Sequence, residues 1–133
     1  MGDGEVTPSH RTPWLRPALA WLVLGTAFAL ALLLINDAAF SAWMSASPPD
    51  PYPQGWALKS QEQVAWAAAA ALGGYAAFRA IHEWPALRRA TFAFAAGAAV
   101  LAAFPGIYEY LQVDHCLGAG GRWNSAGMQC ERP

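Results

Sequence analysis

Three long runs of the sequence contain no charged residue, and they constrain the fold more than any other feature. The runs are Ala18–Ile35, Val64–Phe78 and Ala90–Phe104. The first is rich in leucine and would span about 27 Å as a helix, close to the bilayer hydrocarbon thickness of about 30 Å. The other two are rich in alanine, and the turn that joins them, Arg79–Arg89, carries three arginines. A basic turn between two uncharged runs is typical of a transmembrane helical hairpin.

The composition also indicates a membrane protein. Hydrophobic residues make up 56% of the 133 residues and charged residues only 13%, whereas soluble proteins have about 25% charged residues. We therefore predict an all-α membrane protein with three transmembrane helices, one anchor plus a helical hairpin, and a short disulfide-closed C-terminal tail. A soluble alanine-rich hairpin is the alternative. The net charge of −1 comes with no basic stripe, which argues against nucleic acid as a partner.

The predicted organisation divides the chain into seven parts. These are a cytoplasmic N-terminal tail (1–17), a first span (18–35), a periplasmic proline-rich loop (36–61), a second span (62–81), a cytoplasmic turn (82–89), a third span (90–110) and a periplasmic tail with two cysteines (111–133). The orientation follows from the arginines near the membrane, which are concentrated in the N-terminal tail and in the turn. It places the cysteines in an oxidising compartment. We expect a multi-pass protein of the bacterial inner membrane, with its N terminus cytoplasmic and its C terminus periplasmic.

Prolines are expected to limit the helices. Pro17 should keep the N-terminal tail from forming a continuous helix, and four prolines should hold Ser47–Gln54 extended. The pair Pro105 and Gly106 should kink or end the third span. The first span is either a retained anchor or a cleaved signal peptide, for which Ala39–Ser41 is the acceptable cleavage site.

The second and third spans carry small residues at helical spacing, which let helix backbones approach closely. We predict that they pack helix on helix, within the chain, in a homo-oligomer or against a partner. The residues are Ala69, Ala70, Gly73, Gly74, Ala93 and Gly97.

The tail contains the two cysteines of the chain, Cys116 and Cys130, and several glycines between them. A disulfide between them would stabilise the folded tail by about 3 kcal/mol in the chain-entropy model. The alternatives are a metal site that adds His115, although this spacing matches no familiar zinc pattern, and a redox pair, although no Cys-x-x-Cys is present. We expect no metal and no cofactor.

Aromatic and charged residues near the predicted periplasmic surface are candidates for binding a protein partner. The candidates are Tyr52, Trp56, Arg122 and Trp123. The competing interpretation of the loop is a stiff solvated connector whose tryptophans lie at the lipid interface. Two further polar features are expected to be solvated: the His82-Glu83 pair in the turn and Glu109, for which an ion pair with Lys59 is the alternative.

The tail pattern Cys-x-x-x-Gly-Gly-x-Trp-Asn-x(5)-Cys-Glu resembles tails of assorted small bacterial envelope proteins, some of which are immunity proteins against secreted toxins. The matching residues are Cys116, Gly120, Gly121, Trp123, Asn124, Cys130 and Glu131. The resemblance covers roughly an eighth of the chain. It implies a compartment and a type of protein, and it carries no catalytic residue.

The three uncharged runs also lack histidine, asparagine and glutamine. Proton relays and ion pathways need such groups at membrane depth, so the sequence favours a non-enzymatic interaction protein in contact with membrane lipid. The sharpest form of this hypothesis is an immunity protein that protects the producing cell from a membrane-acting or periplasmic toxin. The alternatives are an accessory or assembly subunit of a larger inner-membrane complex and a small oligomeric transporter.

Overall fold

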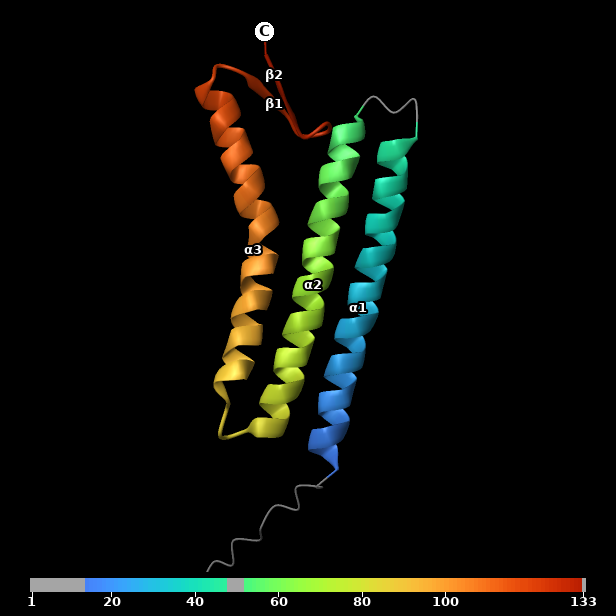
Figure 1. Cartoon of the computed structure of the whole chain (residues 1–133), viewed down its shortest axis with the longest axis vertical. Helices are drawn as coiled ribbons and strands as arrows, with labels where there is room; N and C mark the ends of the chain where they lie inside the picture. Colours follow the sequence, from blue (N-terminus) through green and yellow to red (C-terminus); the bar gives the residue numbers. More distant parts are fainter. Residues whose placement is uncertain (1–13, 48–51, 133) are drawn as a thin grey trace, which may run out of the picture.

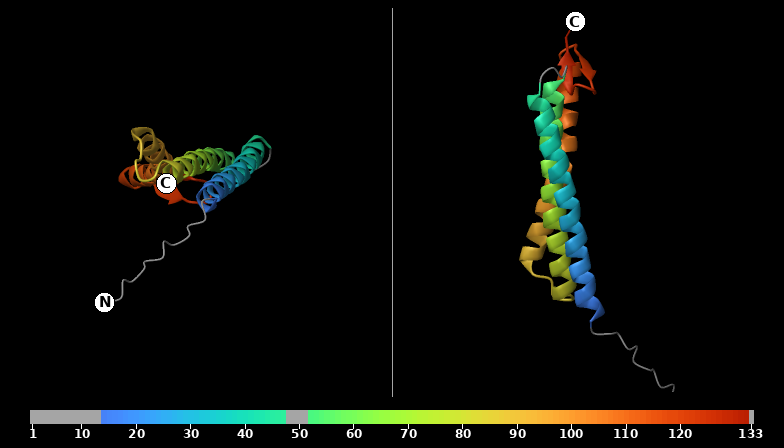
Figure 2. Two further views of the ribbon diagram at one scale, coloured as in Figure 1. Left: turned by 90° about the horizontal axis from the view of Figure 1, so that it is seen from below. Right: turned by 90° about the vertical axis from the view of Figure 1, so that its right-hand side faces the viewer.

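The computed structural model describes residues 14–47 and 52–132 (Figure 1). Its elements in chain order are α1 (Leu15–Ala46), α2 (Pro53–Glu83), α3 (Arg89–Gly118), β1 (Arg122–Asn124) and β2 (Gln129–Glu131). The helices alternate in direction, and α2 lies between α1 and α3 (Figures 1 and 2). The strands lie at the end of the bundle where α2 begins and α3 ends, which we call the hairpin end. The opposite end, with the connection from α2 to α3, is the turn end.

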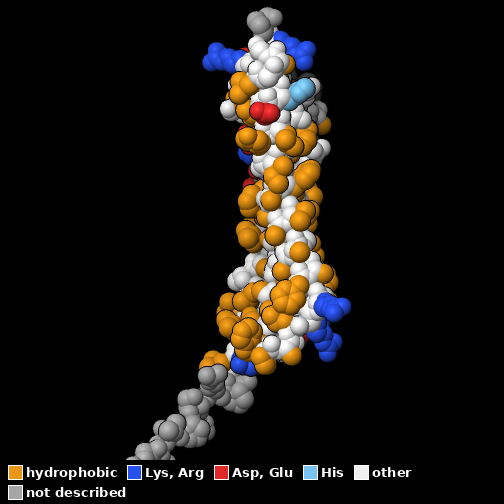
Figure 3. Space-filling model, turned by 90° about the vertical axis from the view of Figure 1, so that its left-hand side faces the viewer, with side chains coloured by type: hydrophobic (Ala, Val, Ile, Leu, Met, Phe, Trp, Pro, Cys, Tyr) orange, Lys and Arg blue, Asp and Glu red, His pale blue; other side chains and the backbone are white. Residues whose placement is uncertain are grey.

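All three helices are long and apolar enough to cross a bilayer. They contain 32, 31 and 30 residues, and large side chains such as Leu33, Phe92 and Val100 point outward with more than half of their surface exposed. On the face shown in Figure 3, a long hydrophobic band separates the charged side chains of the two ends. Such a surface belongs in lipid rather than in water, so the three-helix membrane fold is confirmed over the soluble alternative.

The interior consists of small residues. Most of the buried hydrophobic side chains are alanines: Ala20, Ala31, Ala38, Ala67, Ala69 and Ala76. Small residues inside and large residues outside invert the pattern of a soluble core, because lipid provides no hydrophobic force between helices and close van der Waals packing must hold them together.

The contact between α1 and α2 is closest at Gly74. An ideal Cβ on Gly74 would lie 2.2 Å from the Cβ of Ala27 on α1, a distance that only a glycine permits. Nearer the hairpin end, the buried Ser41 hydroxyl donates a hydrogen bond to Gln63 Oε1 at 3.0 Å. Nearer the turn end, the rings of Trp21 and Phe78 meet edge to face, with their centroids 5.1 Å apart. The α1–α2 pair is therefore fixed at its middle and on both sides of it.

The contact between α2 and α3 is looser. An ideal Cβ on Gly73 would lie 3.6 Å from the Cβ of Ala98, and one on Gly97 would lie 3.7 Å from Leu72 Cδ1; both are ordinary van der Waals distances. Of the other predicted packing residues, Ala69 is buried, Ala70 is half-buried and Ala93 is exposed. The structure thus uses the neighbouring glycines of α2 on two sides, Gly74 against α1 and Gly73 against α3.

The helices continue past two prolines that were expected to limit them. Pro17 lies in the first turn of α1, where a missing backbone N–H leaves no helical bond unmade. Pro105 lies inside α3, which continues to Gly118, so of the two expected outcomes, a kink or a helix end, the helix end does not occur. An interior proline removes one backbone hydrogen bond, and neighbouring hydrogen bonds can carry the helix across it.

The loop predicted at 36–61 is also shorter than expected. Helix α1 extends to Ala46, and α2 begins at Pro53, because a proline is well tolerated at the first position of a helix. Residues 48–51, at the centre of the stretch predicted to be extended, lie outside the described residues, as do residues 1–13 of the N-terminal tail.

The extra helical residues are concentrated at the hairpin end. Beyond the uncharged runs, α1 continues from residue 36 to 46, α2 occupies 53 to 63 and α3 continues from 105 to 118. At 1.5 Å per residue these extensions are about 15–20 Å long. The turn end has shorter extensions, since α1 begins at Leu15 and α3 at Arg89. Among the described residues, the helices therefore continue further beyond the uncharged runs at the hairpin end than at the turn end.

Candidate functional site

A disulfide between Cys116 and Cys130 closes the C-terminal segment, as predicted. Cys116 is buried in the last turn of α3, and its Cα lies 5.6 Å from that of Cys130 on β2. Strands β1 and β2 pair antiparallel, with Trp123 opposite Cys130. Both sulfurs are in the disulfide, so the structure supports the disulfide over the alternative of a metal site formed by these cysteines and His115.

Two glycines shape the connection from α3 to β1. Gly120 has a φ of 73°, a left-handed conformation that glycine adopts without steric cost. Gly121 donates its backbone N–H to the carbonyl of Cys116 at 3.0 Å. An ideal Cβ on Gly121 would lie 2.5 Å from the Sγ of Cys130 and 3.1 Å from that of Cys116. The chain therefore passes directly over the disulfide, where no larger residue fits.

A single asparagine holds the tip of the hairpin. Asn124 Oδ1 accepts the backbone N–H groups of Ala126 at 3.0 Å and Gly127 at 3.3 Å, an arrangement that favours a turn. Its Nδ2 donates to Glu131 Oε1 at 2.6 Å. The tail residues that make up the quoted pattern thus have structural roles within the hairpin.

The tip of the hairpin packs on the first turn of α2. Gly55 and Gly127 are both buried, and an ideal Cβ on Gly55 would lie 3.1 Å from the carbonyl oxygen of Gly127. An ideal Cβ on Gly127 would lie 2.7 Å from Cδ1 of Tyr52. The disulfide fixes the hairpin to α3, and this contact fixes it to α2, so the hairpin bridges the two helices.

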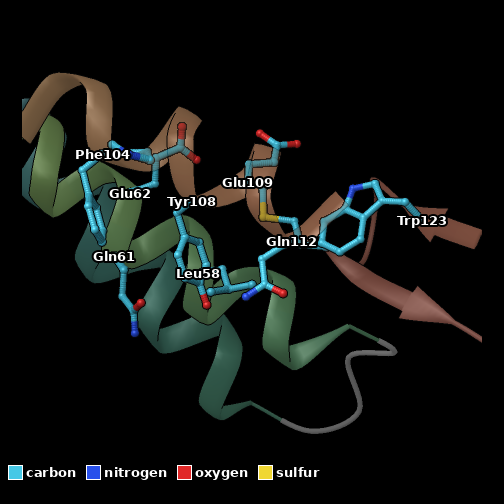
Figure 4. A pocket seen from close by; sticks show the side chains of 10 residues that line it. Leu58, Gln61, Glu62, Phe104, Tyr108, Glu109, Gln112 and Trp123 are labelled. Carbon is cyan, nitrogen blue, oxygen red and sulfur yellow. The ribbon is translucent and has the colours of Figure 1, made fainter. Parts of the chain in front are cut away.

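A cavity of about 160 Å³ lies beneath this bridge, between α2 and α3 (Figure 4). Its walls combine aromatic rings with uncharged polar groups and two carboxylates. The lining includes Gln61 and Glu62 from α2, Tyr108, Glu109 and Gln112 from α3, and Trp123 from β1. The indole Nε1 of Trp123 is buried and has no hydrogen-bond partner among the described residues. Packing and strand pairing, rather than a hydrogen bond, therefore hold this ring in the wall.

The four predicted partner-binding residues all lie at the hairpin end. Tyr52 and Trp56 line a second cavity between α2 and the tip of the hairpin, and Trp56 also meets Phe40 of α1 edge to face, at 6.4 Å between centroids. Trp123 is half-buried in the wall of the first cavity, whereas Arg122 is exposed on β1. The structure brings Tyr52 and Trp56 to one cavity and separates them from the exposed Arg122.

Lys59 and Glu109, the predicted alternative ion pair, do not meet. Lys59 Nζ lies 5.3 Å from the centroid of the Trp56 ring, a distance typical of a cation–π contact. In the described ranges 14–47 and 52–132, the ion pair that forms joins Arg79 and Glu83 at the turn end. Glu109 lies in the wall of the first cavity instead.

Glu83 is not simply solvated, contrary to the expectation for the His82-Glu83 pair. Its Oε1 accepts a hydrogen bond from Arg79 Nε at 2.9 Å, and its Oε2 accepts from Thr91 Oγ1 at 2.7 Å and from the backbone N–H of Arg88 at 3.1 Å. The carboxylate thus joins the end of α2 to the start of α3, where the helix dipole also favours a negative charge. We call this group, Glu83 with Arg79, Thr91 and the backbone of Arg88, the clamp, because it holds the two helix ends together.

The same contacts keep Glu83 ionised. The hydrogen bond from Thr91 is the largest cause, followed by those from Arg79 and the Arg88 backbone, and together they lower the pKa of Glu83 from 4.5 to about 2. A hydrogen bond to the charged form of a carboxyl stabilises that form. Glu83 is the last residue of α2, beyond the uncharged run that ends at Phe78. The clamp is therefore intact at neutral and mildly acidic pH.

Sequence reasoning missed the cavity and the clamp. Glu62, Gln61 and Gln112 were not singled out, because nothing in the sequence shows that α3 continues past residue 110 and faces the start of α2. Thr91 was not connected with Glu83 for a similar reason, since the pairing depends on the course of the turn. A spacing of eight residues between an acid and a threonine does not by itself indicate that the two side chains are in contact.

Comparisons with known proteins add no relationship: no family model matches the chain, and no curated protein or solved structure is significantly similar to it.

Proposed function

We propose that this chain is a non-enzymatic interaction protein of the bacterial inner membrane, which uses its hairpin end in the periplasm to bind a protein partner. The most specific form of this proposal is an immunity protein that captures a membrane-acting or periplasmic toxin. The observation that carries the proposal is the hairpin, which is covalently closed and anchored on two helices that project about 15–20 Å past the apolar runs. A rigid projecting surface loses little conformational entropy when it binds a partner.

The distribution of charge supports the periplasmic placement of the hairpin. Arg16, Arg79, Arg88 and Arg89 lie at the turn end, close to the apolar runs. Lys59 and Arg122 are the basic residues nearest to the apolar runs at the hairpin end. The excess of arginine favours a cytoplasmic turn end, and a disulfide persists in an oxidising compartment such as the periplasm.

The internal packing favours this function over that of an accessory subunit. In the accessory-subunit hypothesis, the small-residue faces of the spans pack against helices of a larger complex. Here Gly74 packs against Ala27 of α1. Gly73 of α2 faces α3, and Gly97 of α3 faces α2. The closest-packing surfaces of α2 are therefore used within the chain.

The test is partner capture at native expression. Tagged protein, gently solubilised from its own membrane, is expected to co-purify with a secreted toxin or toxin domain. Expression of the protein should then protect sensitive cells from that toxin. The Cys116→Ser/Cys130→Ser double variant should insert normally but lose most of the protection, because its hairpin is no longer fixed to α3.

The matched control for this test is Gly118→Ala, at a position where an added Cβ meets no atom within 4 Å, and this variant should protect like the wild type. Stoichiometric co-purification with large membrane subunits would contradict the toxin-capture proposal. So would full protection by the variant that lacks both cysteines.

A further inference from the structure

We propose that the turn end of the bundle binds anionic phospholipids of the phosphatidylglycerol type through four arginines, which we call the turn-end arginines. They are Arg16, Arg79, Arg88 and Arg89. This lipid preference rests on the three-helix membrane fold alone. It is independent of the identity of the protein partner and of the side of the membrane that the turn end faces.

Each helix carries an arginine where its uncharged run stops at the turn end. Arg16 comes two residues before the first run, Arg79 follows the second run directly, and Arg89 directly precedes the third. These three positions meet at the end of the bundle where α1 begins, α2 ends and α3 begins (Figure 1). The arginines therefore border the apolar surface, at the level where lipid phosphates lie.

Three of the turn-end arginines are available to bind a phosphate. Arg16, Arg88 and Arg89 are exposed, and their side chains form no ion pair or hydrogen bond with another residue of the described ranges. A guanidinium group can bind a phosphate through two parallel hydrogen bonds. Arg79 differs, because its side chain is bound to Glu83 in the clamp.

The clamp leaves no free carboxylate at the turn end within residues 14–47 and 52–132. Glu83 is the acidic residue of this end, and both of its oxygens accept hydrogen bonds inside the clamp. The ammonium of a zwitterionic headgroup would therefore find arginines and no acidic partner. A headgroup that carries a negative charge alone is complementary to this surface.

The hairpin end has the opposite balance of charge. Its described residues include five acidic and three basic side chains, and they are Asp37, Glu62, Glu109, Asp114 and Glu131 against Lys59, Arg122 and Arg132. On the face shown in Figure 3, basic side chains at the turn end lie next to hydrophobic ones. The distribution of charge along the bundle thus directs anionic lipid to the turn end.

Exposed tryptophans accompany the arginines. Trp14 lies directly before α1 and is 64% exposed, and Trp84 lies directly after α2 and is 61% exposed. Tryptophan at the end of an apolar surface favours the depth of the lipid headgroups. The two rings would therefore hold Arg16, Arg88 and Arg89 at the depth of the phosphates, while the acyl chains lie along the exposed apolar surface of the helices.

The experiment is native mass spectrometry of the purified full chain in detergent, with equal amounts of phosphatidylglycerol, phosphatidylethanolamine and phosphatidylcholine of identical acyl chains. We expect preferential retention of phosphatidylglycerol. The Arg16→Gln/Arg88→Gln/Arg89→Gln variant should lose this preference and retain at least tenfold less phosphatidylglycerol. The reason is that each basic residue near an anionic lipid surface strengthens binding by about 1 kcal/mol, or about fivefold.

The matched control is Lys59→Gln/Arg122→Gln/Arg132→Gln, which removes the same number of positive charges at the hairpin end. It should retain phosphatidylglycerol like the wild type. Equal retention of the three lipids by the wild type would contradict the proposal, as would unchanged retention by the turn-end variant. An equal loss in both triple variants would show a general effect of net charge and would also contradict it.

Soluble glycerol phosphate in excess provides a second control. It should not displace phosphatidylglycerol, because it lacks the acyl chains that bury apolar surface on the helices. Displacement would indicate a site for a free phosphate and would contradict a lipid site. Unfolding measurements on each variant separate lost binding from lost structure.

Discussion

Gly74→Ala is expected to destabilise the bundle by about 1–3 kcal/mol, the usual effect of forcing a methyl group into a fully packed interior. The added Cβ would lie 2.2 Å from the Cβ of Ala27, so one of the two helices has to move. Both are restrained on either side of this point, by the Ser41–Gln63 hydrogen bond and by the Trp21–Phe78 contact. The strain cannot be relieved by a small tilt, and the measurement is reversible unfolding in mixed detergent micelles.

The neighbouring glycine provides the control for this experiment. An added Cβ at Gly73 would meet Ala98 at 3.6 Å, an ordinary van der Waals contact, so Gly73→Ala should be at least as stable as the wild type. The two variants share the same helix, the same helix propensity change and the same added methyl group. Equal stability of Gly74→Ala and Gly73→Ala would contradict the assignment of Gly74 to the closest point of the α1–α2 interface.

Gly121→Ala is expected to prevent efficient closure of the hairpin. Its Cβ would lie 2.5 Å from the Sγ of Cys130 and 3.2 Å from the carbonyl oxygen of Cys116. Either the disulfide or the backbone must be displaced, and the stabilisation at risk is about 3 kcal/mol in the chain-entropy model. The measurement is the fraction of cysteine that is alkylated under denaturing, non-reducing conditions, together with the unfolding free energy.

Gly118→Ala is the control for this variant as well, because an added Cβ at Gly118 meets no atom within 4 Å. It should remain fully oxidised. Complete disulfide formation and wild-type stability in Gly121→Ala would show that the chain does not pass over the disulfide as the structure places it.

The spans and the disulfide could be predicted because they depend on local properties of the sequence. An uncharged run such as Ala18–Ile35 has to avoid water wherever it lies in the fold, and two cysteines in one oxidised segment have a single way to pair. The small-residue spacing around Gly73 and Gly74 similarly indicated helix packing. It could not show that the two glycines contact different helices, since that depends on the rotation of α2 between its neighbours.

The helix ends and the cavity could not be predicted, because they depend on contacts between distant segments. The sequence predicts that the third span ends by residue 110, yet α3 continues to Gly118 and carries Glu109 and Gln112 to the hairpin end. The hairpin then covers the cavity between α2 and α3, because Gly127 at its tip contacts Gly55 of α2. Neither glycine has a sequence environment that distinguishes it from other turn glycines.

The placement of the oxidised hairpin in the periplasm can be tested directly, because Cys116 and Cys130 are the two cysteines of the chain. The measurement is labelling of intact spheroplasts with a membrane-impermeant maleimide, with and without prior treatment by a membrane-impermeant reductant. We expect no labelling without the reductant and labelling of both cysteines after it, with the membrane still sealed. Labelling without reduction, or labelling that requires a disrupted membrane, would contradict a disulfide-closed hairpin that faces the periplasm.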